Sequence, residues 1–266
     1  YGGSVRLDRE GNLDELDEIH IVTSSVLIKD AIIKNNFENE SNPNNLSLNF
    51  SDGSEFQMLC SPGNKINDSQ IIGELIDQKY RTKTGGFIKY KEGPNGPKDQ
   101  QRLLWISEET HEIKKDISLL MVTDKTYVEA GTEIIKDITT KGAGYLEVFE
   151  ENGIVEKVVV RIGEVIKQNN EVNNNLELSR IFEAGETICD GIKYDMPVFA
   201  EQIEEGILIR QADEYFINKE QFQIETENSL NENQSIEINL VQQLLIKDGE
   251  VVESVEGVDL VKTYLA

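Results

Sequence analysis

The segment Glu108–Glu112 (EETHE) holds the densest group of side chains that could carry acid–base or metal chemistry. Carboxylates and imidazole transfer protons and bind divalent metals. A zinc-hydrolase helix would need two histidines at HExxH spacing, whereas this segment has one histidine and the chain has only two. We therefore expect an exposed loop between two strands here, and we assign no catalytic, cofactor-binding or metal-binding residue.

The other histidine and the two cysteines give no site either. His20 follows an acidic run and precedes Ile21 and Val22, which is typical of a histidine on the face of a strand. Cys60 and Cys189 are far apart, too few for a disulfide framework and too isolated for a metal knuckle. Cys60 has no adjacent Lys or Arg to stabilise a thiolate. We expect two buried free thiols, as in a reducing compartment.

Two short segments resemble functional loops. Lys141–Gly144 (KGAG) is too short for a phosphate-binding loop and precedes a strand instead of a helix, so we expect a turn. Thr123–Thr126 (TDKT) resembles the hairpin that carries lipoyl-lysine in carrier domains of 2-oxoacid dehydrogenases. In that family the glycine-containing bend precedes the lysine, whereas Gly131 follows Lys125 here. A lipoyl-like carrier therefore stays an alternative, which the intact mass after co-expression with a lipoyl ligase would test.

The charge of the chain restricts its partners. Asp and Glu outnumber Lys and Arg by 50 to 26, a formal net charge of −24. Such a surface repels phosphates, so most of it is not expected to bind nucleic acid or an anionic membrane. It matches a basic protein surface, although an acidic surface can also serve only to keep a protein soluble. No apolar run is long enough for a membrane helix.

The apolar residues come in short runs separated by turn residues, which predicts a mainly β fold. Examples of such runs are Leu103–Ile106 and Leu119–Val122. Asp52-Gly53 and Glu151-Asn152-Gly153 are typical of hairpin turns. The Pro- and Gly-containing stretch 92–101 is interpreted as a linker. No convincing amphipathic helix is longer than two or three turns.

A weak internal repeat supports small β modules. Three stretches share the order strand, turn, β-branched residue and glycine, with the glycines at Gly73, Gly131 and Gly257, and a partial copy has Gly185. Glycine at such a place lets a strand bend sharply, as in small barrels. Any all-β chain also gives loose matches of this kind.

The longest distinctive sequence resembles a known family. LLWISEETHEI from Leu103, SLLMV from Ser118, YVEAGTEIIKDI from Tyr127 and GYLEV from Gly144 resemble the β″ subunit of cyanobacterial and plastid RNA polymerase, the C-terminal part of the split β′ subunit. In that family this type of sequence lies in a large insertion into the trigger loop. The insertion is a string of sandwich-barrel hybrid motifs, which are small β modules.

The resemblance implies tandem or nested modules, which we place at 1–98, 103–168 and 176–266. It implies a non-catalytic fragment of a DNA-directed RNA polymerase, a nucleotidyltransferase, that couples trigger-loop motion to contacts with other core subunits or sigma factor. No cofactor is expected here, because the magnesium and zinc ligands of the family lie outside this chain. The implied location is the cyanobacterial cytoplasm or the plastid stroma. A free-standing β-module binding protein is the alternative, whereas the missing initial Met favours a fragment.

Overall fold

The computed structural model describes residues 4–7, 19–22, 26–28, 31–35, 46–50, 52–60, 64–92, 100–167, 179–189, 191–218, 226–228 and 238–266. The chain divides into two compact units, each made of separate stretches of sequence. The first unit contains residues 1–80, 220–245 and 261–266, and the second contains residues 81–219 and 246–260.

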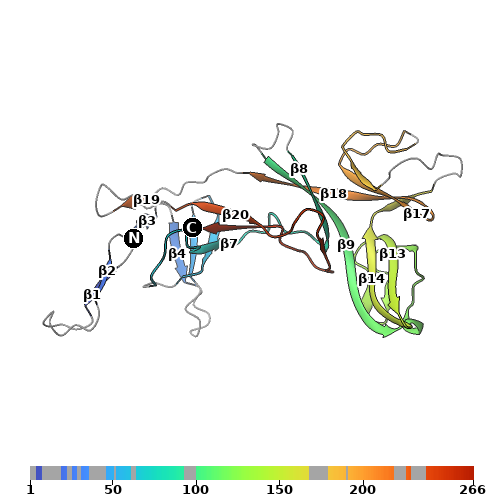
Figure 1. The fold of residues 1–266 in the computed structure, drawn as a ribbon, viewed down its shortest axis with the longest axis horizontal. Helices are drawn as coiled ribbons and strands as arrows, with labels where there is room; N and C mark the ends of the chain where they lie inside the picture. Colours follow the sequence, from blue (N-terminus) through green and yellow to red (C-terminus); the bar gives the residue numbers. More distant parts are fainter. Residues whose placement is uncertain are drawn as a thin grey trace. The chain divides into compact units, whose positions relative to one another are not determined.

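The second unit is built on a ten-stranded, antiparallel sheet (Figure 1). Its strands are β8 (Gly86–Glu92), β9 (Gln100–Asp116), β10 (Thr126–Val128), β13 (Gly144–Glu151), β14 (Ile154–Ile162), β15 (Glu164–Ile166), β16 (Arg180–Phe182), β17 (Val198–Ile203), β18 (Gly206–Asn218) and β21 (Val251–Val252). A separate pair, β11 (Glu133–Ile135) with β12 (Ile138–Thr139), and the 3-10 helix η2 (Ile117–Leu119) complete the unit.

Strand β9 connects the parts of this sheet. Its first half pairs with β8 through the register Phe87↔Ile106 and with β18 through Ala212↔Ile106. Its second half pairs with β14 through Val159↔Thr110. The strand is 17 residues long and runs from the β8–β18 region to the far end of the β13–β14 hairpin, bending on the way (Figure 1).

The bend of β9 and the tight hairpin beside it have local causes. The register between β14 and β9 shifts between Val155 and Lys157, and Lys114 opposite has a positive φ of 51°. A bulge of this kind bends the strand and increases its twist. Asn152 and Gly153 have φ of 53° and 81°, as the two central residues of a type I′ hairpin turn require.

Alternating apolar residues of these strands form the core of the second unit. One cluster lies at the β9–β14–β13 end of the sheet and contains Ile113, Val128, Ile134, Ile135, Leu146, Val155, Val158 and Val160. A second cluster contains Phe182, Ile188, Cys189, Val198, Ala200, Ile207 and Ile209. Trp105 of β9 is fully buried.

The first unit contains a six-stranded antiparallel sheet and two strand pairs. The strands of the sheet are, in spatial order, β20 (Leu240–Leu244), β22 (Val261–Leu265), β7 (Gly73–Leu75), β6 (Glu55–Met58), β5 (Leu46–Phe50) and β4 (Ala31–Asn35). The pairs are β1 (Ser4–Leu7) with β2 (Ile19–Val22), and β3 (Val26–Ile28) with β19 (Thr226–Asn228). Leu48, Phe56, Ile238 and Leu265 form its buried core.

The predicted mainly β fold is confirmed. The described residues form 22 strands and one short 3-10 helix, in curled antiparallel sheets of the kind found in small barrels and sandwiches. Both predicted hairpin turns, at Asp52-Gly53 and Asn152-Gly153, connect paired strands.

The interpretation of 92–101 as a linker is wrong in one respect. β8 and β9 pair as neighbours on either side of this stretch, in the register Glu92↔Gln101, so it connects two strands of one sheet. Its interior, 93–99, and the polar stretch 168–175 lie outside the described residues. The division into three modules at 1–98, 103–168 and 176–266 stays a prediction.

The close approach of β13 to β14 at Gly144 gives a test of this packing. A Cβ atom at Gly144 would lie 2.2 Å from the carbonyl oxygen of Arg161, whereas a Cβ at Gly131 has no atom within 4 Å. We expect Gly144→Ala to lower the free energy of unfolding by about 3 kcal/mol, because the strands must separate. Gly131→Ala should lower the free energy of unfolding by only about 1 kcal/mol, because Gly131 has a left-handed φ that alanine disfavours. Urea denaturation measures both, and equal small losses would contradict the predicted packing.

Candidate functional site

The segment Glu108–Glu112 lies inside strand β9, so the expectation of an exposed loop is wrong. The acidic residues of this segment suggest a loop, but β14 pairs with the strand and buries part of it. Glu109, Thr110 and His111 are all buried, whereas Glu112 is exposed. The alternation of a strand sends Glu109 and His111 to one face of the sheet and Glu108 and Thr110 to the other.

The carboxylate of Glu109 is fully buried and is bound by its own chain. Its Oε2 accepts a hydrogen bond from the backbone N–H of Lys141 at 2.9 Å and lies 3.0 Å from His111 Nε2. Its Oε1 accepts one from the backbone N–H of Gly142. A buried carboxylate needs such donors, because burial removes its water. Lys141–Gly144 is thus a turn, as predicted, and its amides bind a carboxylate of the chain.

The opposite face of the sheet holds a buried arginine that the sequence pattern did not reveal. Arg210 of β18 is 1% exposed. Its Nη2 donates to the Ser107 carbonyl at 2.8 Å and lies 3.0 Å from Glu108 Oε2. Burial lowers the pKa of Arg210, although the nearby Glu201 and Glu108 act in the opposite direction. Arg210 thus fastens β18 to β9, 102 residues away in sequence from Glu108.

A cavity of about 300 Å³ opens on this face. Each of its cationic side chains pairs with a carboxylate: Lys157 with Glu253, Arg161 with Glu147, and Arg210 with Glu108. The rest of its wall includes the aromatic rings of Phe87, Phe149 and Phe199. Four carboxylates, those of Glu108, Glu147, Glu201 and Glu253, face three cations in this wall, so the cavity has only a small net negative charge.

A second cleft, of about 700 Å³, lies near the buried Glu109. Burial raises the pKa of Asp213 in its wall, and Gln211 donates to that carboxylate at 2.9 Å. Burial and a hydrogen bond with Glu164 raise the pKa of Tyr194 in the same wall. The wall thus pairs a tyrosine hydroxyl with a carboxylate, and we assign no catalytic role to this pair.

The structure also places the other residues that the sequence analysis considered, the two cysteines, His20 and Lys125. Cys60 and Cys189 are not joined by a disulfide; Cys189 is buried as expected, while Cys60 is only partly buried and burial raises its pKa. His20 lies in β2, as predicted. Lys125 has a positive φ of 56° in a turn, and its Nζ lies 2.8 Å from Glu204.

No group of three or more His, Cys, Asp or Glu side chains that could hold a metal occurs among the residues that the structure describes. Within the same residues, no helix is long and apolar enough to cross a membrane. The expectation that this chain carries no catalytic, metal or cofactor site stays a prediction.

Comparison with known proteins gives the family. The whole chain is 38% identical to a DNA-directed RNA polymerase subunit β″ of Rhodomonas salina and covers 22% of that subunit. It is 38% identical to a subunit β′ of Prochlorococcus marinus and 37% identical to one of Prochlorococcus marinus subsp. pastoris, covering 20% of each. No family model matches the chain.

The chain is homologous to one segment of the β′ and β″ subunits of RNA polymerase. The predicted resemblance, close from Leu103 to about Gly163 and looser at Leu13–Thr23 and Leu244–Val261, is therefore confirmed, and it extends over the full chain. The chain spans about a fifth of the length of the curated relatives it matches.

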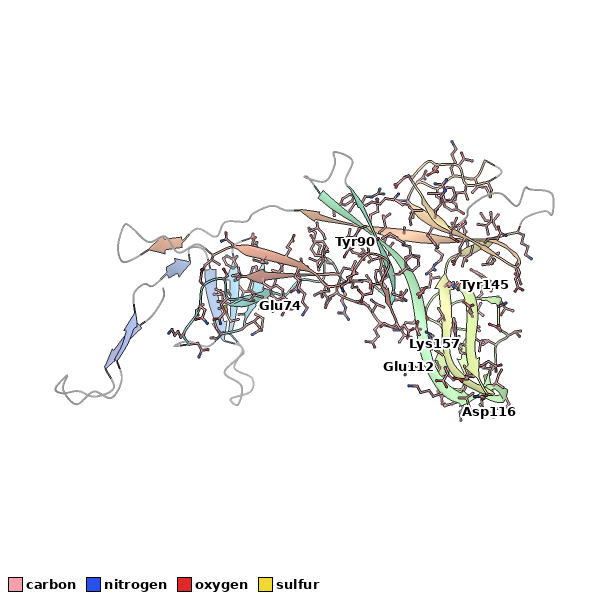
Figure 2. The ribbon with its side chains drawn as sticks, viewed as in Figure 1. Glu74, Tyr90, Glu112, Asp116, Tyr145 and Lys157 are labelled. Carbon is pink, nitrogen blue, oxygen red and sulfur yellow. The ribbon has the colours of Figure 1, made fainter. Side chains whose placement is uncertain are left out.

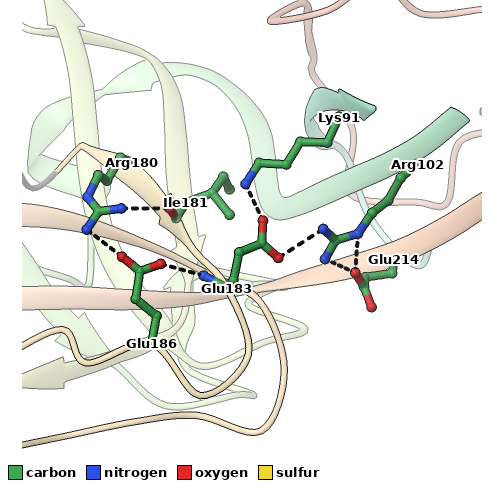
Figure 3. A network of polar contacts seen from close by, with 7 residues as sticks. All are labelled: Lys91, Arg102, Arg180, Ile181, Glu183, Glu186 and Glu214. Carbon is green, nitrogen blue, oxygen red and sulfur yellow. Dashed lines mark hydrogen bonds and ion pairs between the residues drawn. The ribbon is translucent and has the colours of Figure 1, made fainter. Parts of the chain in front are cut away.

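A network of ion pairs holds the β16 region of this polymerase-like segment to β8 and β9 (Figure 3). Glu183 accepts hydrogen bonds from Lys91 of β8 and from Arg102 of β9, the latter at 2.9 Å. Glu186 lies 2.7 Å from Arg180 and accepts from the backbone N–H of Glu183. Burial alone would raise the pKa of Glu183, but the hydrogen bonds from Lys91 and Arg102 lower it overall.

We expect Glu109→Gln to lower the free energy of unfolding by about 3 kcal/mol, because one of the two buried backbone donors then faces an NH₂ group. Glu112→Gln, three residues away on the same strand, is the matched control. Its carboxylate is exposed and pairs with the exposed Lys114, so we expect little change. Urea denaturation at neutral pH measures both variants. Equal effects would contradict the role given to the buried carboxylate.

The lowered pKa of Glu183 predicts a pH dependence. The stabilisation that this carboxylate contributes is fully present above its unfolded-state pKa, near 4.5. This stabilisation is lost as the pH falls through the lower folded-state pKa. Wild type should therefore be more stable than Glu183→Gln at neutral pH, and the two should converge in acid. Denaturation from neutral to acidic pH measures this difference. A difference independent of pH would contradict it.

Proposed function

We propose that this chain is a non-catalytic segment of a β′ or β″ subunit of a DNA-directed RNA polymerase. The match over the full chain to several such subunits, at 35–38% identity, carries this proposal. Where it is described, the chain is strand and turn apart from the three-residue 3-10 helix η2, which fits a β insertion better than the helices of a trigger loop. Cyanobacterial cytoplasm or plastid stroma is the location that goes with this proposal.

The use of the charged side chains supports a non-catalytic role. Glu109, the most buried carboxylate of the acidic segment, accepts backbone N–H groups, and Glu108 pairs with Arg210. Groups committed to such structural hydrogen bonds are not available to bind a magnesium ion or to transfer a proton to substrate. The magnesium and zinc ligands of the polymerase are accordingly proposed to lie outside this chain.

We further propose a mechanical role within the polymerase, in which the segment couples trigger-loop motion to contacts with other subunits or sigma factor. Strand β9 supports this idea. It is continuous over 17 residues and belongs to one packed sheet with β8, β18 and β14. A displacement applied to one end of such an element reaches the other end without a hinge, because packed interiors deform little.

The acidic surface supports contact with proteins. Many described Lys and Arg side chains already pair with carboxylates of the chain: Arg81, Lys91, Arg102, Lys114, Lys125, Lys157, Arg161, Arg180, Arg210 and Lys262. Excess carboxylates therefore dominate what the surface offers. Phosphates and anionic lipids are repelled, whereas a basic face of another polymerase subunit or of sigma factor is attracted.

Replacing this whole segment, residues 1–266 in the present numbering, by a short flexible linker within the polymerase subunit tests this function. We expect the purified polymerase to retain nucleotide addition, while pausing or elongation rate changes by about fivefold, the size of a modest coupling free energy. Single-nucleotide addition assays measure both quantities. A complete loss of nucleotide addition in an assembled enzyme would contradict a non-catalytic role, and unchanged kinetics at every step would contradict the coupling.

A further inference from the structure

An apolar surface lies at the far end of the β13–β14 hairpin. In the segment 117–122, Leu120 and Val122 pack against the core cluster of the second unit. Ile117, Leu119 and Met121 alternate with them and are 43%, 52% and 60% exposed. Ile154, which follows the hairpin turn, is 39% exposed. We call these four residues, Ile117, Leu119, Met121 and Ile154, the distal apolar patch.

Hydrogen bonds fix the backbone that carries this patch. Asp116 caps η2 by accepting from the Ser118 backbone N–H at 2.9 Å. The Ile117 N–H donates to the carbonyl of Gly153 at 3.0 Å, and the Met121 N–H donates to the carbonyl of Ile134 at 2.9 Å. Figure 2 shows Asp116 at the end of the hairpin, well beyond Tyr145 and Lys157. A patch held this way loses little backbone freedom on binding a partner.

Carboxylates adjoin the distal apolar patch at Ile117 and Ile154. Asp116 adjoins Ile117, and its register partner is Ile154. Glu150 and Glu151, at the end of β13, are exposed, and Glu151 is opposite Ile154. Hydrogen bonds from the side chain and backbone of Ser118 lower the pKa of Asp116, which is therefore ionised at neutral pH.

The nearby cations do not cancel this charge. Lys115 is exposed beside the patch, and Lys114 already lies 2.8 Å from Glu112. The patch is thus an apolar centre with a net acidic rim.

We propose that the distal apolar patch docks on another protein, on a surface with an apolar centre and a rim of Lys and Arg side chains. Apolar contact in the centre with charge complementarity at the rim is the usual composition of a protein interface. The inference rests on the proposed function, which makes this protein another component of the polymerase complex.

Other occupants fit the patch less well. The acidic rim repels the phosphates of nucleic acid and the headgroups of anionic lipids. A second copy of this chain would bring two acidic rims together, and each copy has a formal charge of −24.

Site-specific photo-crosslinking in the assembled polymerase tests the proposal. A photo-reactive phenylalanine analogue replaces Leu119 of the full-length subunit, and in a control it replaces Met196, which is 43% exposed in the same unit. We expect Leu119 to crosslink to a second protein at a site flanked by Lys or Arg, and Met196 not to crosslink there. High salt should weaken the crosslink.

A second set of variants tests whether the apolar side chains supply the binding. With the photo-reactive residue at Ile154, the double change Leu119→Glu and Met121→Glu should reduce the crosslink about tenfold, because it places charge in the apolar centre. Met196→Glu is the matched control and should leave the yield unchanged. Circular dichroism and thermal melting of each variant confirm that the fold is retained.

Several outcomes would overturn the inference. These are crosslinks from Leu119 to nucleic acid, to lipid or to a second copy of the chain, or no crosslink in a polymerase that contains the subunit. If instead the full-length subunit does not copurify with the other polymerase subunits, the proposed function fails first. Immunodetection of the subunit in the purified complex distinguishes these two failures.

Discussion

The continuity of strand β9 is the constraint on which the second unit depends. One strand of 17 residues pairs with β8 and β18 along its first half and with β14 along its second half. Every backbone amide in a buried strand must find a partner, so β9 forces these elements into one sheet. The bulge at Lys114 then bends that sheet around the core cluster of Ile113 and its neighbours.

Local features of this fold follow from the sequence, but the long-range ones do not. Asn152-Gly153 predicts the hairpin because both positions need a positive φ, and the structure has it. The sequence does not predict the full length of β9, because Glu108–Glu112 is polar. The burial of this segment depends on hydrogen-bond donors that lie far along the chain. Lys141 is 32 residues from Glu109, and Arg210 is 102 residues from Glu108. Local periodicity contains no information about such pairings.

No catalytic residue is assigned from the sequence, and the structure shows what two of the buried charged side chains do. Glu109 and Arg210 are the kind of buried, charged groups that often mark active sites. Here they accept or donate hydrogen bonds between strands, so their burial is explained by the sheet itself. Homology to one segment of RNA polymerase subunits gives a context for the proposed role, in which a β element carries motion and presents surfaces to other proteins.

The central claim is that an acidic β segment of a polymerase subunit acts through contacts with other proteins. Its most direct test is a pull-down of the purified chain with core polymerase and with primary sigma factor, at low and at moderate salt. The account predicts retention of a polymerase protein that weakens as salt rises, because part of the attraction is electrostatic. Failure to retain core polymerase or sigma factor at either salt concentration would contradict it.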